Sequence, residues 1–461
     1  MPNDLLNESA ARAKRAGAGF DRARGVARAM LAMVLAATLH APSVRAASAT
    51  PRPLEIVVAR DGETSVETVL VPAASTTPTT VVIPIAGALA PDQVRLSAPE
   101  AVVHLDAYTA PRLVRYNDGN PCSPPVDFQF RVAPPPPFRN GAAVASAAIA
   151  RSAGAAEVGT PAPASAFHVV RLGAHGDLER WLASEGRTTP ARERARLERL
   201  AARGGSLVVL APASGTASAP TPGPAVRAVT VTHGSRELWL PLRLAATSSE
   251  VDPDAEQLLL HVLTRTGRAE IAGRASAVVA SGSSLPAFVQ RDYEQFYAAA
   301  FRHASSRGER GAAWLEYAGD TGYCDPCVAD PLPVDELRAL GAAWAELPRG
   351  DSGGHTDVAP EQHRGGARNV FLSRFRIALG SERDGEPMVI GESSAQRGAQ
   401  VRFVVRYPYA GPTTCAAAGA YREKLARRDA DERRALAALT GWSEAEIERV
   451  AAEPAPPVAP R

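Results

Sequence analysis

The sequence from Ala312 to Asp335 reads AAWLEYAGDTGYCDPCVADPLPVD and contains the sharpest change from strand-like to loop-like composition in the chain. Its first part, AAWLEYA, is dominated by apolar and aromatic residues and ends at a Gly-Asp-Thr-Gly turn, which predicts a buried strand. Cys324 and Cys327 then lie in a loop, because the prolines around them prevent a helix before about Val334. This stretch therefore predicts a strand whose end leads directly into a pair of cysteines.

The composition places limits on size and partners. The chain has 461 residues, of which 45% are hydrophobic, so it is long enough to build the cores of two or three domains. Its 51 basic and 49 acidic residues are interspersed and give a formal net charge of +2. A nucleic-acid-binding protein typically carries a basic stripe. The sequence has none, so we expect no nucleic-acid partner.

Residues 1–46 have the three-part form of a secretory signal peptide. A basic region is followed by an apolar run, Ala29 to Leu39, and then by Val44-Arg45-Ala46, which suits a signal peptidase. The apolar run is shorter than the roughly 20 residues of a membrane helix. We therefore expect an exported protein that is periplasmic, cell-surface or extracellular. The alternative is an uncleaved interfacial anchor, in which case only the leader contacts the membrane.

The four cysteines all follow the leader: Cys122, Cys324, Cys327 and Cys415. An even number in an exported protein predicts two disulfides, for which three connectivities are open. Cys324 pairs either with Cys327, leaving Cys122 for Cys415, or with one of the two distant cysteines. A redox-active dithiol would normally begin a helix, and here the next helix starts several residues later. A closed zinc site usually has two C-x-x-C pairs, and here there is one.

Composition divides the chain into successive parts. After the leader we expect a β-rich part over residues 47–132, a Pro/Ala-rich linker or insertion over residues 133–165, a main α+β part over residues 166–445, and a C-terminal tail over residues 446–461. The main part contains a Gly-rich polar loop at residues 346–367. The insertion interrupts one domain or separates two; the sequence leaves both open.

Short connections between successive strand patterns predict an α+β fold with mainly antiparallel sheets, peripheral helices and a helical C-terminal tail. Leu54 to Ala59 and Ser65 to Val71 flank an Asp-Gly turn and form the strongest hairpin signal. Pro286 to Ser306 is the most convincing long helix, with an aromatic stripe at three- and four-residue spacings. We expect this stripe to face the core; a ligand-stacking face is the alternative.

A helix is also expected over Pro99 to Tyr108, with Ser97 as its cap. Near the C-terminus, Ser443 and Glu446 make a capping box for the final helix.

One local pattern occurs three times: an apolar strand ends in Tyr, and a Gly or Pro turn leads to Cys. The tyrosines Tyr116, Tyr317 and Tyr407 precede Cys122, Cys324 and Cys415, respectively. Because strand residues alternate between faces, each Tyr can place its ring in the core and its hydroxyl at the rim of a sheet. We therefore expect the cysteines to gather at strand ends, near enough to pair.

Other candidate chemistry is sparse. His355 and His363, with Asp357 and Glu361, share the Gly-rich loop and could bind a metal ion, although a solvated loop with incidental histidines explains them as well. The sequence contains no G-x-S-x-G, H-E-x-x-H, Walker or dinucleotide-binding motif. We assign no catalytic residue, cofactor-binding residue or metal ligand from the sequence.

Several segments resemble an exported bacterial family, domain of unknown function 2330. They are APRLVRYNDGNPC, FHVVRLGAHGDLERWLASEG, PAFVQRDYEQFYAAAF, WLEYAGDTGYCDPCVADPL and RFVVRYPYAGPTTC followed by LTGW. C-D-P-C followed by A-D-P-L is the most specific piece, and the resemblance covers most of residues 55 to 445. Members of the family begin with further cysteines after the leader, whereas this chain has none before Cys122. The resemblance implies export and a cysteine framework but no reaction.

These observations favour a non-catalytic, disulfide-stabilised envelope or secreted protein that binds a protein or envelope partner through its sheet faces or loops. The alternative is an exported thiol-disulfide or metal-dependent protein that uses Cys324 and Cys327. A count of free thiols distinguishes the two. No cofactor is expected.

Overall fold

The computed structural model describes residues 53–72, 79–123, 167–173, 176–186, 189, 191–210, 226–245, 257–278, 281–308, 311–321, 330–347, 367–379 and 382–453. All of them belong to one compact unit that begins at Pro53. Within these ranges, no helix combines the length and the apolar character needed to cross a membrane. The leader and the segments that contain Cys324, Cys327, His355 and His363 lie outside the described residues.

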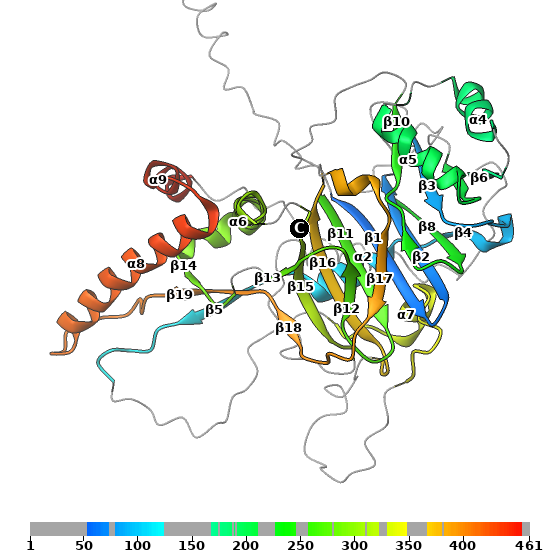
Figure 1. The fold of residues 1–461 in the computed structure, drawn as a ribbon. Helices are drawn as coiled ribbons and strands as arrows, with labels where there is room; N and C mark the ends of the chain where they lie inside the picture. Colours follow the sequence, from blue (N-terminus) through cyan, green and yellow to red (C-terminus); the bar gives the residue numbers. More distant parts are fainter. Residues whose placement is uncertain are drawn as a thin grey trace, which may run out of the picture. The chain divides into compact units, whose positions relative to one another are not determined.

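Nine described strands form the largest sheet (Figure 1). In sheet order they are β13 (Ser276–Val278), β15 (Ala313–Asp320), β16 (Phe371–Ala378), β11 (Gln257–Thr264), β1 (Leu54–Asp61), β2 (Thr64–Pro72), β8 (Val226–His233) and β4 (Val94–Ser97), with β18 (Ala399–Gln400) beside β15. Two pairs, β1 with β11 and β13 with β15, are parallel and the others are antiparallel. The prediction of an α+β fold with mainly antiparallel sheets is confirmed.

The β1–β2 hairpin is the element that the sequence predicted best. Asp61 pairs with Thr64 across the turn, and Gly62 adopts a φ of 58°, a left-handed conformation that glycine accepts without a steric penalty. On the other edge of the hairpin, β2 pairs with β8 along its whole length. The chain segments before and after residues 133–165 therefore contribute strands to the same sheet.

Three smaller sheets complete the strands. The first contains β10 (Leu242–Ala245), β3 (Thr79–Ile85), β7 (Ser206–Leu210) and β6 (Phe167–Arg171); the second contains β12 (Ala269–Ala272), β17 (Met388–Glu392) and β9 (Glu237–Leu238); the third contains β14 (Ser284–Leu285), β19 (Arg402–Tyr407) and β5 (Arg112–Asn117). In the third sheet both pairs of strands are parallel. Because β5 and β19 are parallel, the segments that follow them, which carry Cys122 and Cys415, leave the sheet at the same edge.

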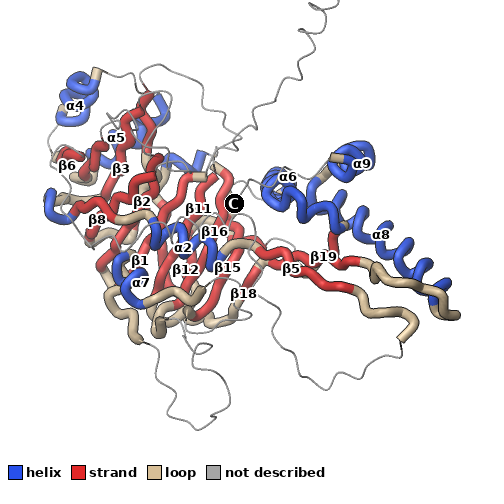
Figure 2. The backbone as a smooth tube through the Cα atoms, turned by 180° about the vertical axis from the view of Figure 1, so that it is seen from behind, coloured by secondary structure: helices blue, strands red, loops and turns tan. Residues whose placement is uncertain are grey.

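The two faces of the main sheet are covered differently. On one face, alternate residues such as Ile56 and Leu260 pack against strands of the first two smaller sheets. On the other face, Val57 and Leu263 pack against α2 (Glu100–Thr109) and α7 (Val334–Ala339), which cross this face in Figure 2. The sheet is thus buried on both sides, which explains why most of its strands are almost continuously apolar.

Helices α4 (Asp177–Glu185) and α5 (Ala191–Ala201) share a core with β3 and β7. The helix expected over Pro286 to Ser306 is a 3-10 turn, η2 (Ala287–Asp292), followed by α6 (Tyr293–Arg307). Short 3-10 turns also occur at η1 (Pro91–Gln93) and η4 (Glu382–Gly385).

The aromatic stripe of α6 faces the core, as expected. Phe296 packs edge-on against Phe403 of β19, with ring centroids 5.0 Å apart. The same core includes residues of α8 (Ala418–Thr440) and α9 (Glu444–Ala452). Ser443 and Glu446 form the predicted capping box of α9.

The predicted cap of α2 is wrong. Ser97 belongs to β4, and its hydroxyl forms a 2.8 Å hydrogen bond with the hydroxyl of Thr230 on β8 instead of capping the helix. A local capping pattern was overridden because the same serine pairs with a strand that lies far away in the sequence.

Candidate functional site

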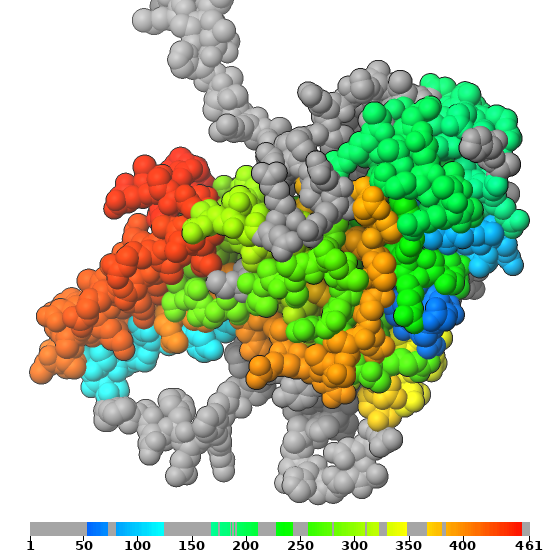
Figure 3. Space-filling model, viewed as in Figure 1, coloured from blue at the N-terminus to red at the C-terminus, as the bar shows by residue number. Residues whose placement is uncertain are grey.

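Cys122 and Cys415 form a disulfide, and their Cα atoms are 5.6 Å apart across a sequence separation of 293 residues. The pairing follows from the parallel alignment of β5 and β19, in which Tyr116 lies opposite Arg406 and Asn117 opposite Tyr407. Both strands therefore end at the same edge, and the loops after them converge. Figure 3 shows the segment near residue 120 beside the one that precedes α8. For Cys122 and Cys415 this agrees with the prediction that the cysteines gather at strand ends; Cys324 lies outside the described residues.

The loop that carries Cys122 is also tied to α8 by charge. Arg428 Nη1 donates to both carboxylate oxygens of Asp118, at 2.9 and 2.8 Å, and Tyr421 Oη donates to Asp118 Oδ2 at 2.7 Å. The Tyr421 hydroxyl in turn accepts a 2.9 Å hydrogen bond from the backbone N–H of Tyr409. The disulfide is therefore one part of a wider connection between the β5 loop and the C-terminal helices.

With Cys122 and Cys415 joined, two of the three connectivities are excluded. Cys324 and Cys327 have only each other left as partners within the chain. Both lie outside the described residues, as do the candidate metal ligands His355, His363, Asp357 and Glu361.

The three tyrosines of the recurring pattern do not share one environment. Tyr317 is 8% exposed and lies in the core, as expected. Tyr116 is 47% exposed, so the expectation of a buried ring is wrong there. Its ring instead lies 4.8 Å from the guanidinium carbon of Arg406 on β19.

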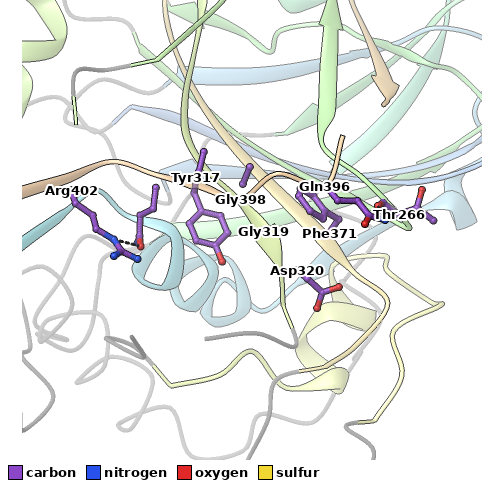
Figure 4. A pocket seen from close by; sticks show the side chains of 11 residues that line it. Thr266, Tyr317, Gly319, Asp320, Phe371, Gln396, Gly398 and Arg402 are labelled. Atoms are coloured by element: carbon purple, nitrogen blue, oxygen red, sulfur yellow. Dashed lines mark hydrogen bonds between the residues drawn. The ribbon is translucent and has the colours of Figure 1, made fainter. Parts of the chain in front are cut away.

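A pocket of about 620 Å³ lies at the end of β15, where β18 pairs with it (Figure 4). Aromatic rings of Tyr317 and Phe371 line it together with polar side chains of Thr266, Asp320, Gln396, Gln400 and Arg402. Arg402 Nε donates to Gln400 Oε1 at 3.0 Å. The lining thus offers apolar surface together with hydrogen-bond donors and acceptors, so the pocket is a candidate binding site.

This pocket adjoins the segment from Ala312 to Asp335. Asp320 is the last residue of β15, and the C-D-P-C segment follows four residues later in the sequence. Gly319 lies close to Tyr317, because an added Cβ would be 3.0 Å from the tyrosine hydroxyl. Burial and the neighbouring Tyr108 raise the pKa of Tyr317, so its phenol stays protonated at neutral pH. Tyr317 can therefore donate a hydrogen bond here but cannot act as a base.

Glu316, the residue before Tyr317 in β15, is the centre of a buried charge network. The carboxylate of Glu316, which is fully buried, accepts from Arg374 Nε at 2.6 Å, from Arg376 Nε at 2.5 Å and from Tyr297 Oη at 2.7 Å. Arg374 Nη1 also donates to Asp106 Oδ1 at 2.6 Å. Burial alone would raise the pKa of Glu316, but the two guanidinium groups lower it below its ordinary value.

Sequence reasoning missed this network, although a signal was present. Arg374 and Arg376 alternate in the apolar strand FLSRFRIA, so both point to the same face of the sheet. A register shift in β15 between Leu315 and Tyr317 places Glu316 opposite them. Charged residues at inward positions of an apolar strand indicate a buried partner, but the partner strand cannot be read from local sequence.

Comparison with known proteins gives one match. The family model described as an uncharacterized protein conserved in bacteria, DUF2330, matches residues 43–380. No curated protein matches the chain. No solved structure matches it either. The matched range includes β1, the charge network and the C-D-P-C segment, whereas Cys415 and the C-terminal helices lie beyond it. Because the match covers well over half of the sequence, the chain belongs to the uncharacterised bacterial family DUF2330.

Proposed function

We propose that this protein is an exported, non-catalytic binding protein whose fold is held together by disulfide bonds. The observation that carries the proposal is the Cys122–Cys415 disulfide, which joins two parts of the chain 293 residues apart. Disulfides persist in oxidising compartments and are rare in the cytosol. A structural disulfide therefore supports the interpretation of residues 1–46 as an export signal.

The binding role is supported by the pocket at the end of β15. Its lining combines the rings of Tyr317 and Phe371 with amide and charged groups. The ionisable groups of the neighbouring charge network are held in one protonation state: Arg374 and Arg376 keep Glu316 ionised, and burial keeps Tyr297 protonated. General acid–base catalysis needs a group that exchanges its proton near the working pH. Glu316 and Tyr297 are therefore unsuited to proton transfer at neutral pH.

The test is to produce the full chain with its own leader and to determine its location, its N-terminus and its free thiols. We expect a mature protein outside the cytoplasm that begins after Ala46, has no free thiol and yields a Cys122–Cys415 cross-linked peptide after non-reducing proteolysis. A cytoplasmic product that retains the leader and has free Cys122 would contradict the proposal.

The thiol-active alternative is tested in the same sample. It has some support, because the Cys122–Cys415 bond leaves Cys324 and Cys327 as a separate C-x-x-C pair. A pair that is reduced by mildly reducing glutathione buffers while Cys122–Cys415 stays intact would favour this alternative. A pair that resists those buffers would favour a structural role.

The binding role itself needs a matched comparison. Native envelope extract is passed over the wild-type protein and over a variant with both Gln396→Ala and Gln400→Ala, which changes the pocket lining. A partner retained by the wild type and lost by the variant supports binding through this pocket. Equal retention by both proteins would place any binding elsewhere.

A further inference from the structure

His261 lies in the middle of β11 and is fully buried. It points to the face of the sheet that α2 covers, because its neighbours across the strands are Val57 of β1 and Arg374 of β16. The strand around it, QLLLHVLT, is otherwise apolar except at its two ends. A histidine at such a position needs partners for both ring nitrogens.

The hydrogen bonds of Thr109, the last residue of α2, assign the histidine tautomer. The Thr109 hydroxyl has one proton, and its 2.8 Å contact with the backbone oxygen of Leu105 takes that proton. Thr109 Oγ1 therefore accepts from Arg374 Nη1 at 3.0 Å and from His261 Nε2 at 3.2 Å. The proton of neutral His261 is thus on Nε2, and Nδ1 carries a lone pair.

Nδ1 of His261 has no hydrogen-bond partner among the described residues. It lies 3.9 Å from Glu55 Oε1, and each of His261, Glu55 and Asp106 offers a ligand atom within 4.8 Å of the other two. A lone pair and two carboxylates thus converge on one point in the protein interior. A positively charged species at this point would accept the lone pair of His261 Nδ1 and lie beside the carboxylates of Glu55 and Asp106.

We propose that Glu55, Asp106 and His261 form a binding site for a divalent transition-metal ion such as Zn²⁺. One imidazole nitrogen and two carboxylate oxygens suit zinc or manganese, whereas calcium and magnesium sites are built from oxygen ligands. Thr109 is the outer partner that orients the imidazole, as is usual for metal-binding histidines. Solvent would complete the coordination, since three protein ligands leave a position open.

The surroundings allow a metal ion to reach this point and also limit its affinity. The Asp106 side chain is 31% exposed, so an ion can enter past α2. Arg374 holds Asp106 Oδ1 at 2.6 Å, which leaves the other carboxylate oxygen for the ion. The positive charge of Arg374 repels a cation. We therefore expect the ion to bind more weakly here than at a site with the same ligands and no neighbouring guanidinium.

The test uses the disulfide-intact chain after treatment with a chelator, labelled with ¹⁵N-histidine. Long-range ¹H–¹⁵N spectra are recorded before and after Zn²⁺ is added, and His261→Gln identifies the His261 signals. We expect a neutral ring protonated at Nε2 whose Nδ1 resonance moves when Zn²⁺ binds. An Nδ1 resonance that does not respond to saturating Zn²⁺ would overturn the proposal. This result is expected if a water molecule, and not a metal ion, bridges Nδ1 and the carboxylates.

Calorimetric titration with Zn²⁺ provides the second measurement. Thr109→Val is expected to lower the affinity about 10- to 100-fold, as the loss of an outer partner typically does, and His261→Gln and Glu55→Gln to lower it at least as much. His168→Ala is the matched control, because His168 lies on β6 in another sheet and is exposed. If the wild type and all three site variants bind Zn²⁺ equally, the ion binds elsewhere, for example at His355 and His363, and the proposal is wrong.

Discussion

Arg374 Nε donates to Glu316 Oε2 over 2.6 Å, and both side chains are buried, at 3% and 0% exposure. The pair joins the central strands β15 and β16 at the position where β15 shifts register. Through Asp106, Arg374 also connects this sheet to the C-terminal end of α2. The guanidinium group thus lies where the helix and two strands meet, and its charge also complements the negative end of the helix dipole.

Glu316→Gln is expected to destabilise the protein strongly. It removes one charge and leaves two buried guanidinium groups without their shared carboxylate, and breaking a buried ion pair typically costs about 3 to 5 kcal/mol. Urea denaturation followed by circular dichroism measures the change. Glu423→Gln is the control, because Glu423 pairs with Arg427 at 3.9 Å on the exposed surface of α8. A Glu316→Gln variant as stable as the Glu423→Gln variant would contradict this account of the network.

The Cys122–Cys415 disulfide is expected to stabilise the folded state, mainly by restricting the unfolded chain. For a loop of this length the chain-entropy model gives about 6 kcal/mol. Cys122→Ser, Cys415→Ser and the double variant should lose the same amount of stability, because all three remove the same bond. Thermal melting without reductant provides the comparison. If the losses of the two single variants add in the double variant, the cysteines stabilise the fold separately and the disulfide does not explain the effect.

Stability should depend on pH through Glu67 of β2. This side chain is 1% exposed, and burial raises the pKa of its carboxyl above the ordinary value, although His233 opposes the shift. The folded chain therefore keeps this proton at pH values where the unfolded chain has lost it. The resulting stability is complete below the ordinary glutamate pKa of about 4.3 and is lost as pH rises through the folded pKa.

Glu67→Gln removes this dependence, because glutamine does not titrate. The free energy of unfolding, measured by urea between about pH 4 and pH 8, should fall for the wild type relative to this variant as pH rises. Glu63→Gln is the control in the same hairpin, since Glu63 is 78% exposed. A constant difference between the wild type and Glu67→Gln across the range would show that Glu67 titrates normally.

Gly341 should not tolerate a side chain. It follows α7 with a φ of 102°, and an added Cβ would lie 2.4 Å from Val66 Cβ on β2. Gly341→Ala combines backbone strain with overpacking, each of which costs about 1 to 3 kcal/mol. Gly62→Ala isolates the backbone part, because Gly62 has a φ of 58° and nothing within 4 Å of its Cβ position. Equal melting temperatures for the two variants would mean that the loop after α7 moves away from Val66.

Local sequence determined the features that depend on neighbouring residues. The Asp-Gly turn specified the β1–β2 hairpin, Ser443 and Glu446 specified the start of α9, and the aromatic spacing specified the buried face of α6. Each of these results from backbone sterics or side-chain periodicity within a few residues. The match of residues 43–380 also rests on sequence alone.

Tertiary structure decided what depends on strands that are distant in the chain. The parallel pairing of β5 with β19 selected Cys415 as the partner of Cys122, and the same pairing placed the exposed ring of Tyr116 beside Arg406. The order of β1, β11, β16 and β15 brought Glu55, His261, Arg374 and Glu316 to one face of the sheet beneath α2. Alternation within a strand shows that a charged residue points inward, but only the pairing of strands determines which charge it meets there.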